Sequence, residues 1–247
     1  MRRALVVGGA NGIGLSIARL LAEDERFDVV YIVDRAEVAE GHRHPKFVCR
    51  IFDLRSDDFS IFDTFTDIDT LMITAGFGRL AHFADISEEH ITDSFTVNAT
   101  SVIRILHHFY PRISSTKDFY CGVMGSIAGF LSSPLFAVYG ATKAALKIFI
   151  ESVNVELEMS GTSNRILNIS PGSIKGTSFY NGTTDLSATR ALAEEILQRL
   201  WAKSDLYIPM YDEIFKDVLE RYHNDFRAEG RHSYEYKLQS GRIIEKK

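Results

Sequence analysis

The sequence predicts an α/β protein of one domain, with a doubly wound parallel sheet covered by helices on both faces in three layers. Two observations predict it. Short apolar runs alternate with segments of helical periodicity along the chain, and the first run leads into a glycine-rich turn that opens a helix. The 247 residues, 45% hydrophobic and 25% charged, suit one large core with a solvated surface. We expect the domain to span residues 1–222, followed by an irregular or mobile polar extension over residues 223–247.

The elements follow one another in a regular order. Apolar runs typical of buried parallel strands occupy residues 4–7, 29–33, 46–52, 70–74, 118–124 and 165–169, and residues 205–208 are a candidate last strand. Helices are expected after the glycine turn and over residues 87–110, 139–159 and 188–203. The two connections between residues 34 and 74 are short, so we expect helices there to be trimmed or absent.

Composition and charge exclude several classes of protein. A formal net charge of −5 gives no general attraction to nucleic acid or to anionic membranes. No apolar stretch approaches the ~18 residues of a membrane span, and the N-terminal apolar run is too short for a signal peptide, so we expect a cytoplasmic protein. We expect Cys49 and Cys121 to be buried reduced thiols, and the histidines lack the ligand spacing of a metal site.

The turn after the first strand carries Gly8, Gly12 and Gly14. A dinucleotide needs glycines there because a Cβ would block both the tight turn and the approach of pyrophosphate to backbone N–H groups. Asp34 lies twenty residues past Gly14, at the end of the second strand, where a carboxylate can accept hydrogen bonds from ribose hydroxyls. This order predicts a dinucleotide-binding sheet of the Rossmann type, against the alternative of a glycine-rich turn without a ligand.

Other candidate ligand contacts also stand at strand ends, where open α/β sheets bind their ligands. They are Gly76, Ser126, and the pair Pro171-Gly172. Asp53 has two interpretations. It either hydrogen-bonds the adenine edge or caps a helix that begins near Ser56.

With Tyr139-Gly140-Ala141-Thr142-Lys143 the chain resembles the short-chain dehydrogenase/reductase family. Ser126 precedes the tyrosine by thirteen residues, and the family's glycine turn appears as Gly8-Gly9-Ala10-Asn11-Gly12-Ile13-Gly14. Asn98 matches the family's helix asparagine, and Pro171-Gly172 matches its Pro-Gly after the sixth strand. The resemblance covers residues 4 to about 177 in the family's order.

The resemblance implies an enzyme that transfers a hydride between a nicotinamide cofactor and a secondary alcohol or ketone. Tyr139 would act as general acid/base, assisted by Lys143 and Ser126, and Asn98 would support the active-site helix and a proton relay to the lysine. The implied cofactor contacts are Gly8, Asn11, Gly12, Ile13, Gly14, Asp34, Arg35, Asp53, Leu54, Ala75, Gly76, Tyr139, Lys143, Pro171, Gly172, Ile174 and Thr177.

The residue types suit this chemistry. A phenol has a pKa near ~10, so Tyr139 is a poor base at neutral pH unless its anion is stabilised. Lys143 lies one helical turn further on the same face, and its ammonium, together with the positive nicotinamide ring, favours the phenolate. Taken singly, each of these residues has a structural alternative: a core-edge phenol, a cap, a surface charge or, for Asn98, an amide bonded to its own helix.

Several positions depart from the family pattern. Val7 stands where the family often has threonine, and Thr74 replaces an asparagine whose amide helps fix the turn. Gly176 replaces the threonine that caps the nicotinamide amide, and Thr177 is the candidate for that contact one residue later. Residues 178–186, with Phe179, Tyr180 and Asn181, form the expected specificity segment but do not identify a substrate.

We expect NAD rather than NADP as the cofactor, because a 2′-phosphate would face the Asp34 carboxylate. NADP-using relatives carry a basic residue in the turn where this chain has Asn11, although Arg35 is placed to bind a phosphate. Surplus apolar residues on the helices at 87–110 and 139–159 predict a homotetramer or homodimer. The alternative function is a non-catalytic nucleotide-binding regulator or scaffold. An epimerase or dehydratase is disfavoured because only about 70 residues follow Pro171.

Overall fold

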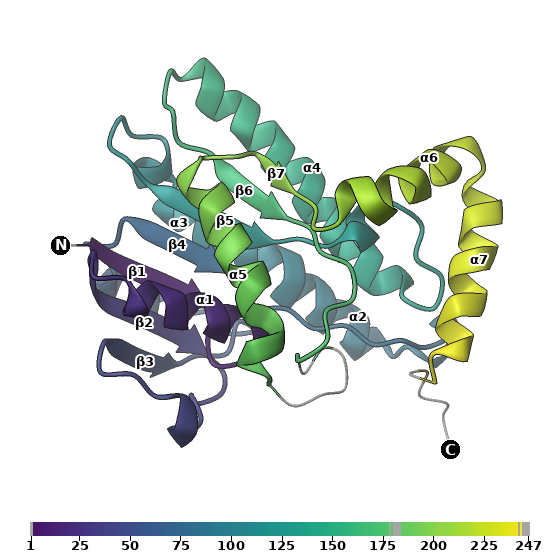
Figure 1. The fold of residues 1–247 in the computed structure, drawn as a ribbon, viewed down its shortest axis with the longest axis horizontal. Helices are drawn as coiled ribbons and strands as arrows, with labels where there is room; N and C mark the ends of the chain where they lie inside the picture. The colour runs from purple at the N-terminus through teal and green to yellow at the C-terminus, as the bar shows by residue number, and fades with distance from the viewer. Residues whose placement is uncertain (1, 178, 180–183, 242, 244–247) are drawn as a thin grey trace.

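A seven-stranded parallel sheet forms the centre of the protein in the computed structural model, which describes residues 2–177, 179, 184–241 and 243. The strands are β1 (Arg2–Val7), β2 (Phe27–Asp34), β3 (Phe47–Ile51), β4 (Thr70–Ile73), β5 (Tyr120–Met124), β6 (Ile166–Ile169) and β7 (Leu206–Tyr207). Their order across the sheet is β3-β2-β1-β4-β5-β6-β7, so the order reverses at β1 (Figure 1). This confirms the predicted doubly wound fold.

Helices cover both faces of the sheet, because successive side chains of β1 point to opposite faces and those on both faces are buried. Ala4 and Val6 pack into one core with α1 (Gly12–Glu23) and α5 (Leu186–Trp201). Leu5 and Val7 point to the opposite face, into a core formed with α3 (Ser101–Ile113) and α4 (Ala137–Met159). On that side α2 (Glu88–Phe95) continues into α3 through a π-helical turn, η4 (Thr96–Thr100), so the helix expected at 87–110 is interrupted.

The connections around β3 contain no α-helix in the part of the chain described. They hold only the short 3₁₀ helices η1 (Glu40–His42) and η2 (Ser60–Thr64), as the short spacing predicted. Phenylalanines cover the sheet where a helix is missing, because Phe62 and Phe65 are buried and pack against Tyr31 and Phe109. Cys49, expected to be buried, is exposed on β3, since this strand is an edge of the sheet and no helix covers it. Cys121 is buried on β5.

The expectation of an irregular C-terminal extension is wrong for the described residues. From residue 223 on they include the end of α6 (Lys216–Asn224), which follows η7 (Tyr211–Phe215), and the whole of α7 (Phe226–Gln239). The Asp225 carboxylate caps α7 by accepting from the N–H groups of Arg227 and Ala228, at 2.9 and 3.0 Å. Only Glu229 and Gly230 of α7 are buried, which explains its polar sequence. In Figure 1, α7 stands beyond the carboxyl ends of the strands.

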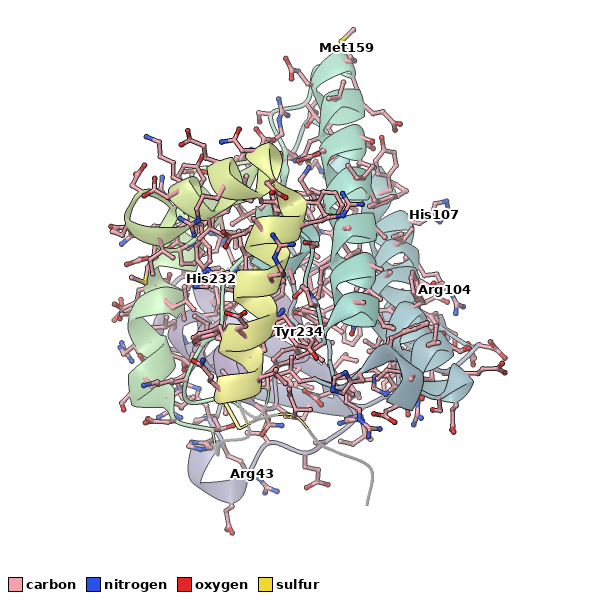
Figure 2. The ribbon with its side chains drawn as sticks, turned by 90° about the vertical axis from the view of Figure 1, so that its right-hand side faces the viewer. Arg43, Arg104, His107, Met159, His232 and Tyr234 are labelled. Carbon is pink, nitrogen blue, oxygen red and sulfur yellow. The ribbon has the colours of Figure 1, made fainter. Side chains whose placement is uncertain are left out.

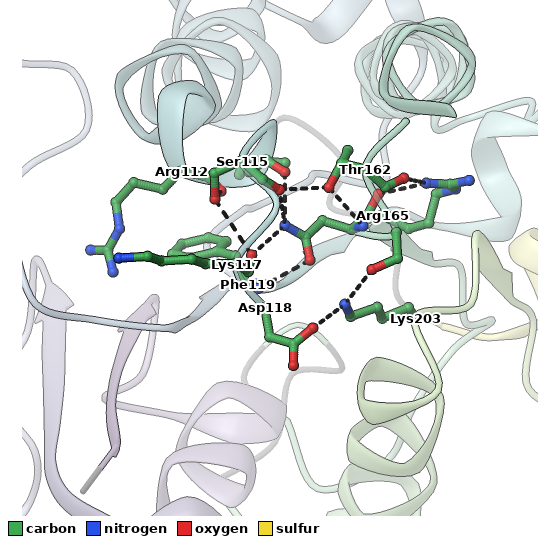
Figure 3. Close-up of polar contacts among 11 residues, drawn as sticks. Arg112, Ser115, Lys117, Asp118, Phe119, Thr162, Arg165 and Lys203 are labelled. Atoms are coloured by element: carbon green, nitrogen blue, oxygen red, sulfur yellow. Dashed lines mark hydrogen bonds and ion pairs between the residues drawn. The ribbon is translucent and has the colours of Figure 1, made fainter. Parts of the chain in front are cut away.

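A hydrogen-bonded cluster fastens the opposite end of the sheet (Figure 3). The buried Asn164 amide donates to the carbonyls of Ile113, Ser115 and Lys117, at 3.1, 3.1 and 2.8 Å. Its oxygen accepts from the N–H of Phe119 at 3.1 Å. One side chain therefore ties the α3–β5 turn to the α4–β6 turn, at the end of the sheet away from the glycine turn.

No helix in the described ranges is both long and apolar enough to cross a membrane. Within those same ranges, no three His, Cys, Asp or Glu side chains come together in an arrangement that would hold a metal ion.

Candidate active site

A cavity of about 650 Å³ opens beyond the carboxyl ends of the strands. All the residues predicted to contact a cofactor line it, except Lys143, which lies beneath its wall: Gly8, Asn11, Gly12, Ile13, Gly14, Asp34, Arg35, Asp53, Leu54, Ala75, Gly76, Tyr139, Pro171, Gly172, Ile174 and Thr177. Residues from the ends of six strands, β1 to β6, thus meet at one site, as the sheet topology requires.

The glycine turn has no room for a side chain at Gly8 or at Gly14. Gly8 has φ of +85°, and a Cβ there would lie 2.4 Å from the Ala75 nitrogen. A Cβ on Gly14 would lie 2.2 Å from the Gly8 carbonyl oxygen. The turn therefore packs tightly against the end of β4 and places the N-terminus of α1 on the cavity wall, where its first N–H groups lack acceptors within the helix.

Thr74 fixes this turn despite the loss of the expected asparagine. Its hydroxyl lies 3.1 Å from the carbonyl oxygen of Val7 and 3.0 Å from that of Gly8, and it donates toward both. Since a Cβ on Gly14 would lie 2.4 Å from the Thr74 hydroxyl oxygen, the two residues are in close contact. A hydroxyl thus joins β1 to β4 at the position of the family's amide.

Asp34 joins the glycine turn to the end of β2. Its carboxylate accepts from the Ala10 N–H at 2.9 Å and from the Ala36 N–H at 3.0 Å. These bonds hold the carboxylate on the cavity wall, at the end away from Tyr139 along the sheet order. Arg35 beside it is exposed and also lines the cavity.

Asp53 does not cap a helix that begins near Ser56. The 3₁₀ helix starts at Ser60, whose N–H donates to Asp58 at 2.8 Å. Asp53 instead accepts from the Arg55 N–H at 2.9 Å and pairs with the Arg55 guanidinium at 2.6 Å, which holds the pKa of Asp53 below its ordinary value. Arg55 also pairs with Asp93 at 3.2 Å, so this corner of the cavity is a small charged network.

Ser126, Tyr139 and Lys143 come together at the other end of the cavity. Ser126 follows β5 and caps η5 (Ile127–Gly129), accepting from the Ala128 N–H at 3.2 Å. Tyr139 and Lys143 lie one turn apart on α4, with the lysine nitrogen 5.6 Å from the centre of the tyrosine ring. The lysine is 2% exposed, and its ammonium donates to the Met124 carbonyl at 2.7 Å.

Burial changes the acidity of both groups. It raises the pKa of Tyr139 to about 12, against a hydrogen bond with Ser126 that lowers it. Burial also lowers the pKa of Lys143 to about 8. Tyr139 is therefore in its acid form at neutral pH, ready to donate a proton, and needs a nearby positive charge to act as a base.

Asn98 does not bond to its own helix. It lies in η4, and its amide forms two hydrogen bonds with the backbone of Phe77: Oδ1 accepts at 2.9 Å and Nδ2 donates at 2.8 Å. Nδ2 also lies 3.3 Å from the Thr142 hydroxyl on α4. A Cβ on Gly76 would lie 3.3 Å from the Asn98 oxygen and 3.4 Å from the Lys143 nitrogen. The Asn98 amide and the Lys143 ammonium therefore both pack against Gly76.

The segment after β6 explains the glycine that replaces the family's threonine. Gly176 has φ of +75°, and a Cβ there would lie 2.8 Å from that of Ala188. Thr177 lines the cavity, contacts Gly12 and donates to the Ile174 carbonyl at 3.0 Å. In the expected specificity segment, Phe179 lines the cavity, whereas Ser178, Tyr180 and Asn181 are outside the described residues.

The residues of the cavity wall that the sequence did not indicate include Phe136 and Lys237. Phe136 precedes α4 and stacks on Tyr139, with ring centres 4.3 Å apart and planes at 22°. Its position three residues before Tyr139 is a local signal from which a contact with the tyrosine ring could be predicted. Lys237 reaches the cavity from α7, and nothing in its local sequence indicates that contact.

Comparison with known proteins places these features in a family. The family model described as short chain dehydrogenase matches residues 2–186. An uncharacterised short-chain type dehydrogenase/reductase of Sinorhizobium fredii is 31% identical over 180 residues, covering 72% of this chain and 71% of the relative. A probable NADP-dependent dehydrogenase of Haemophilus influenzae is 30% identical over 190 residues, covering 72% and 73%. The crystal structure of a short-chain dehydrogenase from Streptomyces avermitilis superposes with a TM-score of 0.76 at 19% identity, covering 97% of this chain and all of that one.

Proposed function

Because the chain belongs to the short-chain dehydrogenase/reductase family, we propose that it is an NAD-dependent oxidoreductase that interconverts a secondary alcohol and a ketone. The observation that carries this proposal is one continuous cavity with the glycine turn and Asp34 at one end and Ser126 and Tyr139 at the other, above a buried Lys143. A regulator or scaffold that only bound a nucleotide would have no use for a buried lysine beside a buried phenol.

The residues fit a dinucleotide. The first N–H groups of α1 lack acceptors within the helix, and a pyrophosphate bound there would replace the Thr184 hydroxyl, which now accepts from the Gly12 N–H at 3.3 Å. Asp34 is held where ribose hydroxyls can donate to it, and Ile13, Pro171 and Ile174 give the far end apolar walls for a nicotinamide ring. When bound there, the nicotinamide supplies or accepts the hydride.

The chain's own residues handle the proton. The Ser126 hydroxyl and the Tyr139 phenol both line the cavity and hydrogen-bond the substrate oxygen. In ketone reduction Tyr139 donates its proton to that oxygen. In alcohol oxidation Tyr139 must first lose the proton, and the Lys143 ammonium 5.6 Å from its ring favours the phenolate. Asn98 holds Phe77 and lies beside Lys143, which keeps this part of the wall in place.

NAD is the cofactor that the Asp34 carboxylate favours. Both of its oxygens accept backbone N–H groups, so the carboxylate is not placed to swing away from a 2′-phosphate. Repulsion of this kind costs several kcal/mol, enough for roughly a hundredfold preference. Arg35 also lines the cavity, and its guanidinium would favour the 2′-phosphate of NADP. Because the chain is also similar to a probable NADP-dependent dehydrogenase, both cofactors have to be compared in the same assay.

Tyr139→Phe tests the reaction. The substitution removes the ionisable oxygen and keeps the ring, so kcat should fall at least about a thousandfold while the Kd of the cofactor changes less than about threefold. Tyr211→Phe, at a 42% exposed tyrosine away from the cavity, is the matched control and should keep full activity. A Tyr139→Phe enzyme with most of its activity contradicts the assignment.

Asp34→Ala tests the cofactor. The wild type should show a kcat/KM ratio for NAD over NADP of about a hundred, and the variant should bring it towards one. A wild-type ratio near one, or one that favours NADP, contradicts the assignment.

For assembly we propose a homotetramer or homodimer built on α3 and α4. Part of the apolar surplus predicted for these helices is used within the subunit, since Leu106, Phe109 and Leu157 are buried. Ile148, Val155 and Met159 remain exposed along α4 and support a contact there. Light scattering that shows a monomer at micromolar concentration would refute it.

A further inference from the structure

Aromatic rings surround the reacting end of the cavity. Phe136 stacks on Tyr139, and Phe179 lies 5.1 Å from the tyrosine ring and 6.0 Å from that of Phe136, centre to centre. Both phenylalanines line the cavity, and Phe179 is 45% exposed towards it and solvent. They come from segments 43 residues apart in the chain, so the fold itself brings these three rings together.

The C-terminal helix holds this wall in place. Lys237 on α7 donates to the Ser133 hydroxyl at 2.7 Å and to the Pro134 carbonyl at 2.9 Å, in the loop that leads to Phe136. A Cβ on Gly230 would lie 3.4 Å from the Ser132 hydroxyl, so α7 packs closely on the same loop. Tyr234, labelled on α7 in Figure 2, has its ring 6.3 Å from that of His82.

Charge is distributed unevenly along the cavity. Among the described lining residues, carboxylates occur at Asp34, Asp53 and Asp93, and Arg55 ties the last two into one network at the far end. Around Tyr139 the lining side chains include Ile127, Ala128 and the two phenylalanines, together with Ser133 and with Lys237, whose ammonium donates to that serine and to the Pro134 carbonyl. The two phenylalanine rings thus offer flat apolar surfaces beside the carbon substituents of a substrate oxygen held by Ser126 and Tyr139.

We propose that the substrate is an aryl carbonyl compound or the corresponding secondary alcohol, with a flat apolar ring next to the reacting carbon. The inference rests on the proposed function, because Tyr139 sets the position of the carbonyl. A ring bonded to that carbon comes within reach of the Phe136 and Phe179 rings, whose separations from Tyr139 are already those of favourable aromatic pairs. A saturated ring of the same carbon skeleton offers as much apolar surface but no aromatic face.

Binding tests the proposal without turnover. Acetophenone and cyclohexyl methyl ketone are titrated by calorimetry into the wild-type protein saturated with oxidised cofactor, which cannot reduce either ketone and leaves the Tyr139 hydroxyl in place. Acetophenone should bind about tenfold more tightly, from two aromatic contacts. Phe136→Leu and Phe179→Leu, each added to that protein, should reduce the ratio about threefold. Phe179 is partly exposed, so its variant is not at risk of misfolding, and Phe83→Leu, at a 68% exposed ring outside the cavity, should leave the ratio unchanged.

Turnover separates the two proposals. In the wild type, 1-phenylethanol should have a kcat/KM about tenfold above that of 1-cyclohexylethanol. Three results overturn the inference and leave the oxidoreductase proposal standing. The first is equal binding of the two ketones, and the second is a preference for acetophenone that survives both leucine variants. The third is turnover confined to aliphatic alcohols. A binding preference for acetophenone in a protein that turns over no alcohol or ketone supports the aromatic site and overturns the proposed reaction.

Discussion

Replacement of Lys143 by methionine should stabilise the protein while it destroys activity. Burial lowers the pKa of this lysine from its ordinary 10.5 to about 8, which corresponds to about 3 kcal/mol against the charged form in the folded state. Methionine fills nearly the same volume without a charge, and loses one hydrogen bond, from the charged ammonium to the Met124 carbonyl, worth about 2 kcal/mol. The net gain is about 1 kcal/mol at pH 7, or a rise in Tm of roughly 2–4 °C.

The pH dependence identifies the cause. Below pH 8 the lysine is protonated in both states, so the wild type carries the full cost of the buried charge. Between pH 8 and 10.5 the unfolded chain binds more protons than the folded one, so wild-type stability rises with pH relative to the variant. The advantage of Lys143→Met should therefore shrink from pH 8 upward, and by pH 10 the variant should no longer be the more stable protein.

Thermal or urea unfolding of both proteins without cofactor at pH 7, 9 and 10 measures this difference. Lys147→Met is the matched control, because Lys147 lies one turn further on α4 and pairs with Glu151 at 2.9 Å near the surface. Its stability should fall by about 0.5 kcal/mol or less. A Lys143→Met protein that is less stable than the wild type at pH 7, or a difference that does not change with pH, refutes the reasoning. Activity in the same samples should be lost, because the proton transfer loses its cation.

Three other substitutions test the frame of the site. Gly8→Ala should lower the free energy of unfolding by at least about 3 kcal/mol in urea titrations, whereas Gly161→Ala, at φ of +82° in open space, should cost only about 1. Asn164→Ala should cost about 3 kcal/mol in the same assay and leave kcat/KM within about twofold, since its hydrogen bonds lie at the opposite end of the sheet. Thr74→Val should weaken cofactor binding about fivefold in titrations, and Thr74→Ser should not. Equal losses for Gly8→Ala and Gly161→Ala, or for Thr74→Val and Thr74→Ser, would contradict the contacts invoked, and so would an Asn164→Ala protein with wild-type stability.

The strands and the glycine turn could be predicted because their signals are local. A parallel strand buried on both faces is a continuous apolar run, as in Leu71, Met72 and Ile73. The residue after such a strand lies at the edge of the sheet where ligands bind, and this position does not depend on the rest of the chain. The rule placed Gly8, Asp34, Asp53, Gly76, Ser126 and Pro171-Gly172 at that edge, and the family resemblance implied the other predicted cofactor contacts. Cys49 was misplaced because burial on β3 depends on whether a helix covers the edge, which is not a property of the strand.

The C-terminal helices could not be predicted in the same way. Their apolar stripe is weak because most of α7 is exposed, so the polar sequence resembles that of an extension. Lys237 and Ser133 are 104 residues apart, and their hydrogen bond is a property of the finished fold. Phe136 was near a recognised motif, but its role depends on Phe179, from a segment that reaches it only through the packing of the strand ends.

The departures from the family pattern show what the pattern specifies. Thr74 lacks the amide of asparagine but its hydroxyl lies within hydrogen-bond distance of both Val7 and Gly8 carbonyls, so the join between β1 and β4 is kept by another group. Gly176 lacks the threonine side chain, and its left-handed backbone close to Ala188 would not accept one. Thr177 then lines the cavity against Gly12. The pattern is therefore a set of contacts rather than of residue types, and a changed residue argues against function only where its contact is also missing.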